Sequence, residues 1–98
     1  MKLSWSPLAV ERVSEIIDYI SQDKPMAADK WLLTVFSKVE QLRSNPGTGR
    51  IVPEINDSQF RELFYGNYRI IYHIEEKQIS ILTIRHGKQI LPIDEIKA

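Results

Sequence analysis

Two arginines and a histidine are spaced so that they could meet at one end of a small β-sheet. Arg69 lies in the strand-like run 68–74, and the next strand-like run, 78–84, leads directly into Arg85 and His86. In adjacent strands these residues would place two guanidinium groups, which bind phosphate or carboxylate, beside an imidazole, which transfers protons near neutral pH. We therefore expect function at this end of the sheet.

Each of these side chains also has a structural interpretation. Arg69 lies among aromatic and aliphatic residues, so an ion pair with Glu62 on the neighbouring strand is as reasonable as a role in target binding. Arg61 and Arg85 are expected at the exposed end of the sheet, which favours function. Arg50 follows a loop, where a solvated arginine is the commoner case. His86 is either a general acid and base or a hydrogen-bonded residue at a strand end.

The residue types exclude several kinds of site. The chain has no cysteine and only two histidines, His73 and His86, so neither a disulfide, a cysteine nucleophile nor a recognised metal-ligand set is expected. His73 falls in the middle of a strand and is interpreted as structural. We expect neither a metal nor a cofactor.

The elements that would position these residues change character halfway along the chain. A short strand, 2–5, precedes two helices, Pro7 to Gln22 and Pro25 to Arg43, each with apolar residues at helical spacing. The break Asn45-Pro46-Gly47 ends the second helix, and strand-like runs follow at 50–52, 60–64, 68–74 and 79–84. Residues 90–98 form a tail, predicted to be a strand end or a short helical turn.

This pattern predicts a single α+β domain over residues 1–98. The short connection between the helices favours an antiparallel hairpin, packed on one face of an antiparallel β-sheet in the main order β-α-α-β-β-β. Run 68–74 is apolar on both faces in places and is expected to be the central strand. Trp5, Trp31 and Phe36 are at core-like spacing and are predicted to be buried.

Composition is that of an ordinary soluble protein. Of 98 residues, 43% are hydrophobic and 27% charged, and 13 Lys and Arg balance 13 Asp and Glu. Net charge is therefore zero, and any site for a polyanion must be local and built from arginines. No apolar run is long enough to span a membrane, and the first residues lack the apolar core of a signal peptide. We expect a cytoplasmic protein that does not bind membranes.

The sequence resembles one family over nearly its whole length, in a set of short motifs that occur in the right order. They are Trp5-Ser6-Pro7-Leu8-Ala9, Ile16-Ile17-Asp18-Tyr19-Ile20, Leu42 to Arg50 through Asn45-Pro46-Gly47, Arg61-Glu62-Leu63, Gly66-Asn67-Tyr68-Arg69-Ile70-Ile71-Tyr72 and Ile81 to Lys88. On these residues the chain is similar to the RelE/ParE superfamily of type II toxin–antitoxin toxins, which includes plasmid stabilisation proteins.

The resemblance implies a toxin that inhibits growth, but it allows two targets. RelE-like members cleave mRNA in the ribosome without a metal, whereas ParE-like members inhibit DNA gyrase. Arg61 and Arg69 match basic positions of the RelE site, but Gln89 stands where RelE has an arginine, and no tyrosine follows Tyr72. Other ribosome-dependent members use a glutamate and a histidine, for which His86 with Glu54 or Glu62 would serve.

Inhibition of DNA gyrase is therefore the favoured prediction, and ribosome-dependent mRNA cleavage is the alternative. Whether the chain is an enzyme is left open. The residues predicted to bind the target or its phosphate are Arg50, Arg61, Arg69, Arg85 and Lys88, and those predicted to be catalytic in a nuclease are His86, Arg85, Arg69 and Arg61. A third hypothesis is a non-toxic family member that acts as a binding module.

The resemblance also implies a protein partner. In the family, an antitoxin neutralises the toxin by wrapping over the helical hairpin and along the sheet. Leu33 and Ile93 are apolar residues that would then contact the antitoxin. The other expected partners are DNA gyrase or, in the alternative, the ribosome and its mRNA.

Overall fold

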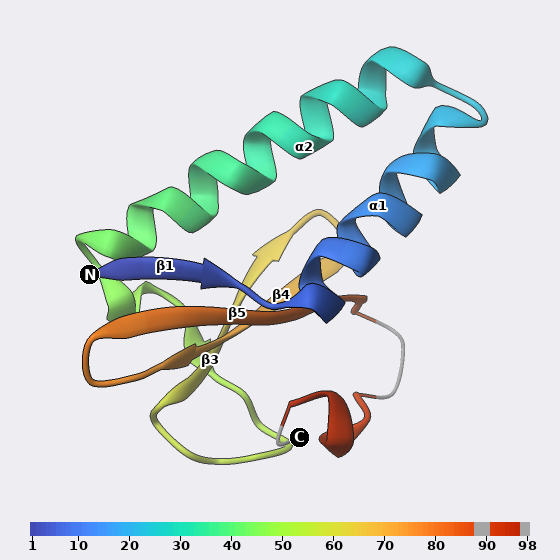
Figure 1. Cartoon of the computed structure of the whole chain (residues 1–98). Coiled ribbons are helices and arrows are strands. Elements are labelled where there is room, and N and C mark those ends of the chain that lie inside the picture. The colour runs from blue at the N-terminus through green and yellow to red at the C-terminus, as the bar shows by residue number, and fades with distance from the viewer. Residues whose placement is uncertain (88–90, 97–98) are drawn as a thin grey trace.

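The computed structural model describes residues 1–87 and 91–96, and two helices and a five-stranded sheet form its body (Figure 1). The strands are β1 (Lys2–Trp5), β2 (Arg50–Ile51), β3 (Phe60–Tyr65), β4 (Tyr68–Ile74) and β5 (Gln78–His86). The helices are α1 (Pro7–Ser21) and α2 (Pro25–Glu40), and three short 3₁₀ turns are η1 (Gln41–Arg43), η2 (Pro46–Thr48) and η3 (Ile93–Glu95).

Both helices begin where the sequence predicts. The Ser6 hydroxyl accepts a hydrogen bond from the Ala9 amide at 3.0 Å and donates one to the Leu82 carbonyl at 2.8 Å, so it caps α1 and ties the helix start to β5. Prolines occupy the first turns of α1 and α2, where a missing amide N–H costs no hydrogen bond. The last predicted turn of α2 is the separate 3₁₀ turn η1.

The predicted packing is confirmed, with one addition to the sheet. Strand order is β1-β5-β4-β3-β2, and β2 to β5 pair antiparallel, whereas β1 pairs parallel to β5 with Leu3 opposite Ile79. The sheet is therefore mixed rather than purely antiparallel. Four strands follow the helices, one more than in the order β-α-α-β-β-β, because the two-residue β2 also joins the sheet.

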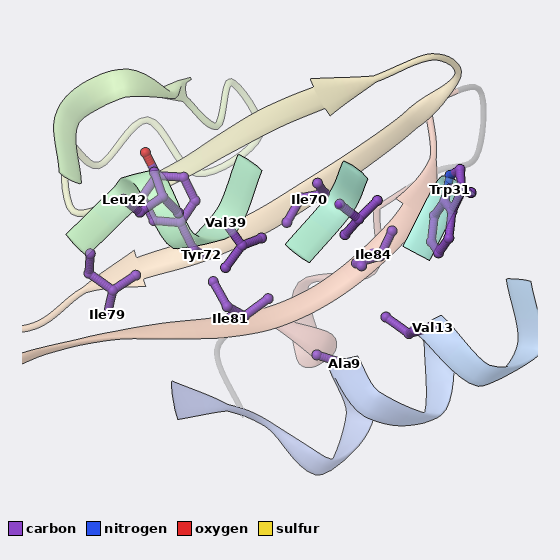
Figure 2. Packing of buried hydrophobic residues seen from close by; sticks show 11 residues of the cluster. Ala9, Val13, Trp31, Val39, Leu42, Ile70, Tyr72, Ile79, Ile81 and Ile84 are labelled. Carbon is purple, nitrogen blue, oxygen red and sulfur yellow. The ribbon is translucent and has the colours of Figure 1, made fainter. Parts of the chain in front are cut away.

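The main core lies between the helices and the sheet. Figure 2 shows Ala9 and Val13 of α1 and Trp31 and Val39 of α2 facing the aliphatic side chains of β4 and β5. β4 is the central strand, as predicted, and Ile70, Ile71 and Tyr72 in it are fully buried. Burial of this layer is the largest stabilising contribution that the sequence pattern offers.

A second, smaller cluster covers the opposite face of the sheet. Its buried members are Val52, Ile71, Leu91 and Ile96. Figure 1 shows the C-terminal turn below the sheet and the two helices above it. The tail therefore forms a short helical turn, one of the two predicted outcomes, and it supplies half of the buried residues of this cluster.

Two of the three aromatic residues predicted to be buried are only partly covered. Trp31 is 7% exposed, but Phe36 is 46% exposed and Trp5 is half-buried. The two rings contact each other edge to face, with centroids 5.3 Å apart. The predicted burial of Phe36 is thus wrong, because its position on α2 turns the ring toward Trp5 at the rim of the core rather than toward the sheet.

Candidate functional site

The β4–β5 end of the sheet carries the predicted pair of arginines. Arg69 lies directly opposite Arg85, and Tyr68 lies opposite His86. Because side chains alternate along a strand, both arginines are on the sheet face away from the helices, whereas His86 is on the helix face with Tyr68. The sequence therefore placed the three residues at the correct end, but the imidazole and the guanidiniums lie on different faces.

Arg69 is the centre of a buried ion-pair network. Its Nε donates to Glu62 Oε1 at 2.6 Å, and its two terminal nitrogens donate to Glu54 at 2.8 and 2.9 Å. Glu62 is 1% exposed and also accepts from Arg50 Nε at 2.6 Å. The hydrogen bond from Arg69 holds the pKa of Glu54 below its ordinary value. The predicted ion pair between Arg69 and Glu62 is confirmed.

Arg50 is the most exposed member of this network. Its side chain is 59% exposed, and its guanidinium carbon lies 4.8 Å from the centroid of the Phe64 ring. Arg50 belongs to β2 rather than to a solvated loop, and it both pairs with Glu62 and stacks on an exposed aromatic ring. A cation over a ring that solvent reaches adds a modest stabilising contribution.

Arg85 belongs to a second network, which joins three elements. Arg85 Nη1 donates to Glu95 Oε2 at 2.9 Å, and Arg12 Nη2 on α1 reaches the same oxygen at 3.5 Å. The other carboxylate oxygen, Glu95 Oε1, accepts from the Thr83 hydroxyl at 3.1 Å. Arg85 is 19% exposed, so the expectation that it lies at an exposed sheet end is wrong, because the C-terminal turn covers it.

Arg61 lies apart from the other two strand arginines. It pairs with Tyr72 on β4, three positions from Arg69. Its side chain therefore lies on the opposite face of the sheet from that of Arg69. Its guanidinium donates to the carbonyls of Ser58 at 2.9 Å and Gly49 at 3.0 Å. The structure thus does not bring Arg61 and Arg85 to a common end, contrary to the expectation. Arg61 instead holds the loop before β2.

His86 lines a cleft of ≈ 400 Å³ between α1 and the ends of β4 and β5. Its ring contacts Tyr68 edge to face, with centroids 5.7 Å apart. The remaining lining residues are Arg12, Glu15, Ile16, Tyr19, Ile84 and Arg85. Glu62, proposed as a partner of His86 in a nuclease, lies on the other face of the sheet, and both Glu54 and Glu62 are bonded to Arg69.

Sequence reasoning missed several members of these networks. Arg12 and Glu95 were not singled out, although they lie in the described part of the chain beside Arg85. The only signal for Arg12 was its place near the start of an amphipathic helix. The predicted phosphate-binding residue Lys88 and the position of Gln89 lie outside the described residues. Within residues 1–87 and 91–96, no group of three metal-ligating side chains comes together.

An apolar hollow of ≈ 280 Å³ lies where β1, α1 and α2 meet. It is lined by Trp5, Val10, Val13 and Phe36. Leu33, predicted to face a partner, is 70% exposed on the same helix as Phe36, while the side chain of Ile93 lies outside what the structure describes. Among the described helices none is long and apolar enough to cross a membrane.

Comparisons with known proteins agree on one family. The sequence model of the family described as "ParE toxin of type II toxin-antitoxin system, parDE" matches residues 3–91. "Putative toxin Y4kP" of Sinorhizobium fredii is 33% identical over 93 residues, which are 93% of each chain. "Toxin RelE2" of Caulobacter vibrioides is 29% identical over 87 residues, 88% of this chain and 94% of that one.

A solved structure has the same fold. The "Chromosomal ParDE TA system from P. aeruginosa" contains a chain that superposes with a TM-score of 0.75 at 22% identity, covering 90% of this chain and 97% of the other. The predicted α+β fold, with two helices on one face of the sheet, is confirmed by this likeness.

Proposed function

The chain belongs to the ParE toxin family of type II toxin–antitoxin systems, and we propose that it arrests bacterial growth by inhibiting DNA gyrase. The observation that carries this proposal is the state of Arg69, which a nuclease would need to bind phosphate. Arg69 is 6% exposed, and its Nε and both terminal nitrogens donate to Glu62 and Glu54. A buried guanidinium with every nitrogen bonded to a carboxylate is poorly placed to bind the phosphate of a scissile bond.

The division of the candidate residues between the two sheet faces supports the same proposal. A phosphodiester cleavage site needs its proton-transfer group and its phosphate-binding groups within hydrogen-bond reach of one another. Here His86 and Arg61 lie on the helix face and Arg69 on the opposite face, so that of the three strand arginines only Arg85 lines the cleft of His86. The net charge of zero is also a poor match to densely charged ribosomal RNA.

Ribosome-dependent mRNA cleavage is the second candidate function, favoured by the likeness to "Toxin RelE2". In that reading Arg61, Arg69 and Arg85 bind and stabilise the phosphate while His86 transfers a proton. The sequence lacks the late arginine and tyrosine of the RelE site. A non-toxic member that acts as a binding module remains the third candidate.

Two assays on the purified protein separate these functions. Gyrase supercoiling is measured with and without the chain, and primer extension maps cleavage on translated mRNA. We expect loss of supercoiling and intact message. Cuts in phase with codons and unchanged supercoiling would establish the nuclease instead, and no effect in either assay at confirmed folding would support the non-toxic reading.

The proposed partner is a cognate antitoxin that covers the outer side of the helices. The apolar hollow at Trp5 and Phe36 and the 70% exposed Leu33 are apolar surface on the helical layer that a bound partner would cover. An amphipathic helix bound along α2 would bury these side chains. Co-purification of the two proteins as a stable complex tests this contact.

A further inference from the structure

The second arginine network contains a site that the chain fills with its own side chain. Arg12 on α1, Arg85 on β5 and the Thr83 hydroxyl surround the carboxylate of Glu95, which comes from the C-terminal turn. Two guanidiniums and a hydroxyl that converge from two elements, α1 and β5, are the donor set with which proteins bind oxyanions. We propose that Arg12, Thr83 and Arg85 form a binding site for a phosphate-type oxyanion, which Glu95 occupies in competition with it.

The first reason is that Glu95 does not satisfy the site completely. Its oxygen is 2.9 Å from Arg85 but 3.5 Å from Arg12, which is the limit for a hydrogen bond. Arg12 Nε is buried and has no hydrogen-bond partner among the described residues. A buried guanidinium N–H without a partner is costly, so a further acceptor that reached it would stabilise the site.

The second reason is the shape of the anion. A carboxylate has two oxygens in one plane, and both are already in use, one by Thr83 and one by the two arginines. A tetrahedral phosphate has more acceptor oxygens and can bridge donors that approach from different directions. The site, built from one donor on a helix and two on a strand, fits that geometry better than it fits a carboxylate.

Replacing the Glu95 carboxylate with phosphate would affect how the C-terminal turn is held on the sheet. Glu95 belongs to the segment whose Leu91 and Ile96 cover Val52 and Ile71 on the open face of the sheet. Displacing its carboxylate removes the polar anchor of this segment and leaves only the apolar contacts. Phosphate binding would thus loosen the C-terminal turn. Glu15, which is bonded to Arg12 and lines the cleft, opposes the anion and limits its affinity.

Titration with inorganic phosphate tests the site on the purified full chain. Glu95→Ala removes the competing carboxylate, and Glu76→Ala is a matched control, since Glu76 is exposed and lies near the other end of β5. Both substitutions change the net charge equally. We expect Glu95→Ala to bind phosphate at least tenfold more tightly than the wild type and the control, with the Nε–H resonance of Arg12 shifting on binding.

Two further arms make the result decisive. Glu95→Gln keeps the size of the side chain and its contact with Thr83 while removing the charge, so it gives the same comparison if Glu95→Ala does not fold. A mononucleotide titrated in parallel shows whether the phosphate group of a nucleotide is accepted as well as the free ion, and binding of either supports the site. Equal phosphate affinity of the folded Glu95 variant and Glu76→Ala, or an unmoved Arg12 resonance, would overturn the proposal and leave Glu95 as a structural ion-pair partner.

Discussion

Arg69 and Arg85 lie directly opposite each other on β4 and β5, yet separate carboxylates hold them. Like charges opposite each other in a sheet are destabilising unless each is compensated. Glu62 and Glu54 compensate Arg69 from β3 and the connector after β2, and Glu95 compensates Arg85 from the C-terminal turn. The folding of the open sheet face therefore depends on segments far apart in the chain.

Arg69→Ala is predicted to damage both folding and toxicity. Removing the guanidinium leaves Glu62, 1% exposed, with Arg50 as its one remaining partner among the described residues, which should cost about 3 kcal/mol of unfolding free energy. Arg50→Ala is the matched control, because Arg50 pairs with the same carboxylate but is 59% exposed and should cost less than about 1 kcal/mol. Denaturant melts and growth assays measure both effects. If Arg69→Ala melts like the wild type but no longer arrests growth, Arg69 belongs to the target-binding site instead.

Arg61→Ala and Arg85→Ala are predicted to weaken toxicity more than folding. The structure raises the expected folding cost above that of solvent-facing arginines to about 1–2 kcal/mol each, because Arg61 bonds two loop carbonyls and Arg85 bonds Glu95. Arg43→Ala, which removes an exposed arginine paired with Glu40 three residues before it, is the control for loss of one charge. Unchanged growth arrest by both variants at normal expression would remove these residues from the candidate site.

The ion-pair networks also show how far sequence reasoning reaches. The pair of Arg69 with Glu62 was predictable, because both fall in strongly patterned strands that must be neighbours. Glu54 and Glu95 come from a connector and a tail that have no periodicity, so nothing in the sequence gives their position in space. Their contacts are set by how these segments fold back over the sheet.

The facing of strand residues was equally hard to predict. Arg61 and Arg85 belong to strands that the alternating pattern predicts. Which face of the sheet each side chain lies on, however, depends on the register in which the strands pair. The register between β4 and β5 shifts between Ile71 and Tyr72, which changes the facing of β5 residues on one side of the shift. No local pattern in the sequence indicates this register shift. The parallel pairing of β1 with β5 is a non-local choice of the same kind.

Gly49 and Gly47 provide a test of the loop that Arg61 holds. A Cβ added at Gly49 would lie 2.5 Å from the Glu62 carbonyl oxygen and 2.7 Å from the Tyr72 hydroxyl, whereas one at Gly47 meets nothing within 4 Å. Tyr72 also accepts a hydrogen bond from the Gly49 amide at 2.9 Å. Gly49→Ala should therefore cost about 3 kcal/mol, and Gly47→Ala less than about 1 kcal/mol. Equal melting of the two variants would contradict this packing.

The pH dependence of stability should have an acid-sensitive part that involves Glu54. The folded-state pKa of Glu54 is lowered, chiefly by the hydrogen bond from Arg69, so the unfolded chain takes up a proton first as the pH falls. Its stabilising contribution is complete above its ordinary pKa of about 4.3 and is lost as the pH falls through the lowered value. Glu54→Gln should flatten the pH dependence of the melting temperature over this range more than Glu76→Gln does, which makes the same change at an exposed carboxylate. Identical slopes in the two variants would refute the assignment.

Leu33 tests the proposed antitoxin surface separately from toxicity. Because Leu33 is 70% exposed, Leu33→Glu should change the unfolding free energy by less than about 1 kcal/mol and should leave growth arrest intact. It should, however, place an unpaired charge inside the antitoxin interface. We expect the affinity for the antitoxin to fall at least tenfold, and rescue of growth by co-expressed antitoxin to weaken. Ser58→Glu adds the same charge at an exposed position outside both helices and serves as the control. Expression of the unmodified chain alone must slow growth, and growth must return with antitoxin. If antitoxin binds Leu33→Glu and the wild type equally well, the contact lies on another surface.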